Sequence, residues 1–415
     1  MSEPSSPERR RRGRIAIGVG CGGLVLVLAA SIAGYVHIAN QLPPVEPDPV
    51  VLPSPNGYDA FVAALSADPN IAPGSPLQDP AKSSDQALRR EIVKHEGTLA
   101  SARRAFALPF EVPPEPDPFN PPVGQYEQVR HFLRLLDARS RVAAAYEGPG
   151  SVMEYALDSL ELGACFGRHG NVMRYLTAGA CLSMGARRAE APVEDLPAEA
   201  AAAAAARLER IMARRSPLAD VFRATRRVAL QGIRSKHRFG LNPSPVERWL
   251  GPLYPTSFEY RDAAGAFDAL ISAAERPYVG RPAPPQARFW STRVIMPTLH
   301  PLGLPAAAGD TALRELRLQL ALRQHRLATG GYPSSLADLV PRWVPDVPPD
   351  PFTGKPFIYR RTATGYLLYS VGPDGTDDGG APILLTSLKA LSKGDLVAGR
   401  LFSRSGGKVP AAATR

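Results

Sequence analysis

The segment from Ile15 to Ile38 contains no Lys, Arg, Asp or Glu, and no other feature of the chain constrains its fold as strongly. A helix of this length can cross a bilayer core of roughly 30 Å. Several arginines lie just before it, and arginine-rich flanks stay on the cytoplasmic side. The sequence therefore predicts a cytoplasmic basic tail at 1–14 and a transmembrane helix at 15–38. It places the bulk of the protein outside the cytoplasmic membrane of a bacterium.

A cleaved signal peptide is the alternative interpretation of this segment. The small residues Ala29-Ala30-Ser31 and Ser31-Ile32-Ala33 offer cleavage sites. Cleavable hydrophobic regions usually run about 7–15 residues, and this one is longer. The length favours an uncleaved signal anchor, which makes the membrane the first expected partner. Cys165 and Cys181 then lie outside, either as one disulfide or as two buried, inert thiols.

The net charge of +10 is carried mainly by arginines spread over helical sequence. Such a spread is typical of a GC-rich genome, and attraction to acidic surfaces is the other interpretation. No nucleic-acid-binding motif and no interleaving of basic and aromatic residues occurs, so nucleic acid is not an expected partner.

Proline clusters divide the part of the chain that follows the anchor. Residues 39–55 form a Pro-rich linker, and 56–300 read as a helical domain. Asn56 is a predicted N-cap, and a second helix is expected from Ser84 or Asp85 to Ala107. Glu154 and Glu161 lie one or two turns apart on an amphipathic pattern, which predicts a solvated face. No 34-residue repeat supports a tetratricopeptide array.

A different pattern begins near residue 305. A leucine stripe starting at Leu313 predicts a helix that ends at Gly330. Phe357–Arg360 and Tyr366–Ser370 read as two strands of a hairpin. The expected fold class is thus mainly α, with a small α+β domain at 305–385 and a C-terminal tail at 386–415.

Three aspartates lie close together after the second strand, at Asp374, Asp377 and Asp378, with glycines between them. Calcium takes six to eight oxygen ligands, and glycine permits the tight turns that bring close-set carboxylates together. The alternative is a solvated acidic turn, because Asp-Gly pairs are common in turns.

The order of motifs from about Leu313 to Pro382 resembles the C-terminal domain of the major pseudopilin of type II secretion systems. The shared motifs are Tyr332-Pro333, Asp350-Pro351, Tyr369-Ser370 and the acidic loop that follows. The resemblance implies a helix followed by a small antiparallel sheet. It also implies structural Ca²⁺ held by Asp374, Asp377 and Asp378, with Ser370 or nearby carbonyls as weaker ligands.

No catalytic motif is present in the sequence. The histidines are scattered singly, without metal-ligand spacing, and no nucleophile elbow or phosphate-binding loop lies outside the predicted membrane segment. The sequence therefore predicts a non-enzymatic interaction or scaffold protein of the cell envelope that binds an unidentified envelope protein. One alternative is an accessory component of a type II secretion or pilus-like system, with secretion-machinery components as partners. A second alternative is an envelope hydrolase whose site has no recognisable motif.

Overall fold

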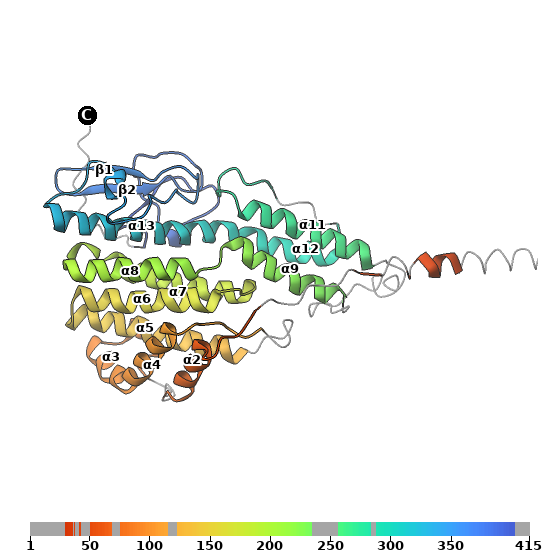
Figure 1. Cartoon of the computed structure of the whole chain (residues 1–415), viewed down its shortest axis with the longest axis horizontal. Coiled ribbons are helices and arrows are strands. Elements are labelled where there is room, and N and C mark those ends of the chain that lie inside the picture. Colours follow the sequence, from red (N-terminus) through yellow and green to blue (C-terminus); the bar gives the residue numbers. More distant parts are fainter. Residues whose placement is uncertain are drawn as a thin grey trace, which may run out of the picture.

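The computed structural model describes residues 30–35, 37, 41–42, 50–68, 75–114, 123–234, 256–283 and 288–402. Within these ranges the chain is mostly helical, with one small antiparallel sheet. The helices form stacked layers, and the sheet covers the last layer at the top of Figure 1.

No helix in the described ranges is both long enough and apolar enough to span a membrane. This finding corrects the predicted fold class, which included an N-terminal transmembrane helix. The signal anchor and the single-pass localisation that depended on that helix are corrected with it. Of the predicted span, residues 15–29, 36 and 38 lie outside the described ranges.

The first layer contains α2 (Gly57–Ser66), α3 (Asp85–Ile92) and α4 (Glu96–Ala107). Asn56 caps α2 as predicted, since its side chain accepts a hydrogen bond from the backbone N–H of Tyr58. The helix expected up to Ala107 is interrupted by a 3₁₀ turn at Val93–His95. This turn directs the buried His95 ring to the carboxylate of Asp68, a contact between distant residues that helical periodicity does not reveal.

The central layers contain α5 (Val123–Tyr146), α6 (Pro149–Gly167), α7 (Val172–Glu190) and α8 (Ala198–Arg214). Glycines allow α6 and α7 to approach closely. A Cβ atom added at Gly185 would lie 2.7 Å from the carbonyl oxygen of Ala156, and one at Gly163 would lie 2.9 Å from that of Ala178. Larger residues at these two positions would push the helices apart.

Buried charges also join the central layers, contrary to the predicted solvated face of α6. Asp158 and Glu161 of α6 are buried, and Glu154 is the half-exposed member of the group. Arg207 of α8 donates to Asp158 Oδ1 and Glu161 Oε2, both at 2.7 Å. The prediction was wrong because a buried glutamate that pairs with an arginine has the same helical spacing in the sequence as a solvated glutamate.

At one end of the molecule, α9 (Leu218–Arg234), α11 (Thr256–Ala274) and α12 (Trp290–Leu299) lie side by side (Figure 1). They bury a separate apolar cluster that includes Phe222 and Phe267. The chain then enters α13 (Gly303–Thr329), which ends at Gly330 in the left-handed conformation, φ 83°, as predicted.

The sheet has the order β1-β2-β3, with β1 at Ile358–Arg361, β2 at Tyr366–Ser370 and β3 at Leu396–Val397. The predicted hairpin is confirmed by antiparallel pairing of β1 with β2. The third strand, β3, lies within residues 386–415, which the sequence analysis predicted to be a C-terminal tail. Its two residues are too few to produce an alternating pattern.

Helix α13 links the helical layers to the sheet. Leu313 and Leu316 share one apolar cluster with Leu160 of α6 and with Phe352 and Leu396. Farther along α13, residues such as Leu322 pack with the hairpin. The layers and the C-terminal module, defined here as residues 303–402, are therefore joined by a common hydrophobic core.

Candidate cation site at the acidic loop

The acidic loop, residues 371–380, follows β2 and turns sharply at its glycines. Gly372 and Gly375 have φ of 72° and 70°, and Gly379 and Gly380 have φ of 72° and 86°. Residues other than glycine rarely adopt this left-handed backbone conformation. The glycines thus give the loop the curvature that places its aspartates close together.

Asp377 lies on the exposed side of the loop. Its Oδ1 accepts hydrogen bonds from the Tyr369 hydroxyl and the Gly379 N–H, both at 2.8 Å. Its Oδ2 lies 3.7 Å from the guanidinium of Arg360. The Gly379 N–H and the Tyr369 hydroxyl lower the pKa of the Asp377 carboxyl, so this group is ionised at neutral pH.

Asp378 is joined to a fourth aspartate that the sequence analysis did not single out. Oδ2 of Asp378 accepts the Gly394 N–H at 2.7 Å. In return, Asp395 accepts the N–H groups of Asp378 at 3.3 Å and Gly380 at 2.6 Å. Asp395 stands alone in the sequence just before β3, so no spacing pattern pointed to it.

Asp395 is fully buried, and its burial raises the pKa of its carboxyl. Hydrogen bonds from Gly380 and Asp378 oppose this rise, whereas the negative charges of Asp377 and Asp378 add to it. The negative charges of Asp377 and Asp378 thus both disfavour ionisation of Asp395.

Asp374 is half-buried, whereas Asp377 and Asp378 are exposed. Its Oδ1 accepts the Thr376 N–H at 3.1 Å. The second oxygens of Asp374 and Asp378 accept no hydrogen bond within the described part of the chain. Among the described residues, no group of three or more His, Cys, Asp or Glu side chains is already arranged to hold a metal ion.

Ser370, the fourth predicted ligand, is not brought together with the aspartates. It is fully buried, and its hydroxyl donates to Oδ1 of Asp350 at 2.8 Å. Asp350 Oδ1 also accepts the Phe352 N–H at 2.9 Å. Ser370 therefore fastens the Asp-Pro turn to β2, and its oxygen accepts the Gly372 N–H at 3.2 Å where the acidic loop begins.

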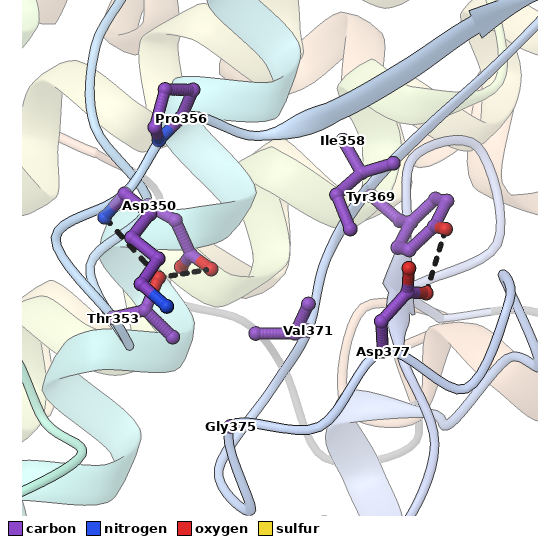
Figure 2. Close-up of a pocket in the computed structure, with 9 residues that line it drawn as sticks. Asp350, Thr353, Pro356, Ile358, Tyr369, Val371, Gly375 and Asp377 are labelled. Carbon is purple, nitrogen blue, oxygen red and sulfur yellow. Dashed lines mark hydrogen bonds between the residues drawn. The ribbon is translucent and has the colours of Figure 1, made fainter.

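A cavity of about 220 Å³ separates the Asp-Pro turn from the acidic loop. Figure 2 shows Asp350 and Asp377 on opposite sides of it, with the Tyr369 hydroxyl directed at Asp377. The cavity is lined by Asp350, Thr353, Lys355, Pro356, Ile358, Tyr369, Val371, Gly375 and Asp377. Because it is small and carries both signs of charge, it suits a small ion or polar group better than a large apolar ligand.

A second polar cluster lies in the first layers of helices, and the sequence analysis treated its histidines as isolated. The Asp68 carboxylate accepts from His95 Nδ1 at 2.9 Å and from the Thr98 hydroxyl, and His131 Nε2 lies 3.4 Å away. The Asp68 side chain is only 4% exposed. This cluster joins the end of α2 to α4 and α5.

Cys165 and Cys181 are both free and buried. Burial raises the pKa of each thiol to about 12, so neither is a reactive thiolate at neutral pH. The interpretation as inert thiols is therefore confirmed over the disulfide.

The acidic loop presents ionised oxygens and curved backbone, which are the donors that hard cations prefer. No protein-family model matches the chain, and no curated protein and no solved structure matches it.

Proposed function

We propose that this chain is a non-enzymatic interaction protein whose C-terminal module is stabilised by Ca²⁺ bound at the acidic loop. The proposal rests on one observation above all. Asp377, Asp378 and Asp395 lie close enough for the first two to raise the pKa of the third. A divalent cation would relieve this repulsion, and oxygen donors favour calcium.

The ligands that we propose are Asp374, Asp377 and Asp378. The second oxygens of Asp374 and Asp378 are free of hydrogen bonds in the described part of the chain, and Asp377 is exposed. Ser370 is not included, because its hydroxyl is committed to Asp350. Ca²⁺ would supply charge neutralisation, while the backbone bonds of Asp395 hold the loop in shape.

The order of elements in the C-terminal module is the order that the proposed resemblance to the pseudopilin domain implies. A long helix is followed by the Asp-Pro turn, an antiparallel hairpin and the acidic loop. An ion in this loop would be structural, since the buried carboxylate beside it, Asp395, is occupied by the backbone N–H groups of Asp378 and Gly380. In this proposal the module contacts a partner protein, and fold-level resemblance alone does not identify that partner.

The proposal is tested by calorimetric titration of the full chain with CaCl₂ and, separately, with MgCl₂. Heat of binding is expected for Ca²⁺, at one site per chain, and is expected to disappear in the triple variant Asp374→Ala, Asp377→Ala, Asp378→Ala. Asp195→Ala, an exposed acid on a different surface, serves as the matched control. Binding that persists in the triple variant would reject the proposed ligands.

A further inference from the structure

Glu315 is a fully buried carboxyl group in the middle of α13. Neither of its oxygens accepts a well-formed hydrogen bond among the described residues, and the Ser370 backbone is the one group there that favours its ionised form. Thr311, one turn earlier on α13, is equally buried, and its hydroxyl also lacks a partner. Unpartnered buried carboxylates are among the most costly groups in a protein interior.

The charged groups that face Glu315 from the neighbouring elements are both acids. Glu190 lies at the C-terminal end of α7, and Asp350 lies in the Asp-Pro turn before β1. Glu190 accepts the Leu401 N–H of the C-terminal module at 2.7 Å, and within the module Asp350 accepts from the Ser370 hydroxyl. Both carboxyl groups act on Glu315 where the helical layers join the module.

In the described part of the chain, no arginine is among the groups that act on Glu315. The two arginines nearest in sequence on α13 are engaged elsewhere. Arg314 donates to the Pro349 carbonyl at 2.5 Å, and Arg317 pairs with Glu209 of α8 and with Asp346. An ionised Glu315 would therefore face two further acidic groups, offset only in part by the backbone of Ser370.

We infer that Glu315, Glu190 and Asp350 form a proton-binding site that couples the C-terminal module to the helical layers, with Glu315 carrying the proton in the folded protein. This site is separate from the acidic loop and does not depend on Ca²⁺. Burial and the charges of Glu190 and Asp350 raise the pKa of Glu315 well above its ordinary value of 4.5. A raised folded-state pKa stabilises the fold at low pH, and this stabilisation is lost as pH rises from about 4.5 through the folded-state pKa.

The test compares wild type, Glu315→Gln and Glu199→Gln by urea unfolding in chelator at several pH values. Gln is isosteric and cannot ionise, and Glu199 is an exposed control on α8. Between about pH 5 and about pH 8, the folded-to-unfolded ratio of wild type is expected to fall at least about tenfold more than that of Glu315→Gln. Glu199→Gln should follow wild type. Equal pH dependence in all three proteins would overturn the inference.

Glu190→Gln provides a second test that leaves Glu315 in place. Removing one neighbouring negative charge is expected to lower the folded-state pKa of Glu315, so the pH-dependent loss of stability should end at a lower pH than in wild type. The infrared carbonyl band of a protonated carboxylic acid should be present at neutral pH in wild type and absent in Glu315→Gln. No movement of the transition, or no such band in wild type, would contradict the proton site.

Discussion

The carboxylate of Asp395 accepts the backbone N–H of Gly380 at 2.6 Å, which ties the residue before β3 to the end of the acidic loop. Asp395 also accepts from Asp378, and Asp378 accepts from the Gly394 N–H in return. These hydrogen bonds hold the end of the acidic loop against the residues just before β3. The shape of the loop therefore depends on an aspartate that lies outside it.

Replacing Asp395 with Asn is expected to loosen the acidic loop. The Asn side chain has one acceptor oxygen, so at least one of the two backbone N–H groups loses its partner in a buried site. We expect a loss of about 1–3 kcal/mol in the free energy of unfolding, measured with urea. Asp195→Asn, at an exposed position, should change this value little. Equal stability of the two variants would show that Asp395 does not hold the loop.

Arg207→Ala should be one of the most damaging substitutions in the helical layers. It removes one of two arginine partners from Asp158 and from Glu161, whose side chains are 2% and 11% exposed. Arg103 stays paired with Asp158 and Arg214 with Glu161. The loss therefore approaches, without exceeding, the roughly 3–5 kcal/mol of a buried ion pair broken from one side. Arg223→Ala is the control, since Arg223 and Asp220 form an exposed pair worth about 0–1 kcal/mol. Similar losses in the two variants would contradict the account of this network.

Asp68 is expected to contribute to acid unfolding. Burial acts to raise its pKa, but hydrogen bonds from His131, Thr98 and His95 outweigh this effect and lower the pKa below 3.8. A lowered folded-state pKa gives stability that is present above pH 3.8 and is lost as pH falls through the folded-state value. Asp68→Asn should cost about 1–3 kcal/mol at neutral pH and flatten the acid limb of the stability curve.

Circular dichroism across the acid range, with urea unfolding at each pH, measures this effect. Asp59→Asn, at an exposed position on α2, is the control and should retain the wild-type acid limb. An unchanged acid limb in Asp68→Asn would show that this cluster does not control acid stability.

Local signals in the sequence predicted local structure well. Asn56, Gly330 and the hairpin strands act through neighbours a few residues away, so their roles can be recognised without knowing the fold. The helix boundary at Val93–His95 was missed because it depends on Asp68, which lies far away in the sequence.

The candidate site was predicted only in part, for the same physical reason. Asp374, Asp377 and Asp378 lie within five residues of the chain and were found. Asp395 was missed because it reaches Asp378 through the pairing of β3. The buried acids Asp158, Glu161 and Glu315 were missed too. The sequence shows only that a residue is Asp or Glu. Whether its side chain is solvated, paired with arginine or protonated depends on how it is packed in the fold.

The most direct test of calcium stabilisation is the melting temperature of the full chain in CaCl₂ and in chelator. Wild type is expected to melt at a higher temperature with Ca²⁺, because ligand at 100 times its Kd adds about 2.7 kcal/mol to the stability of the folded state. The triple variant Asp374→Ala, Asp377→Ala, Asp378→Ala should melt at the same temperature in both solutions. An unchanged wild-type melting temperature, or an equal rise in the triple variant, would contradict a calcium-stabilised module at this loop.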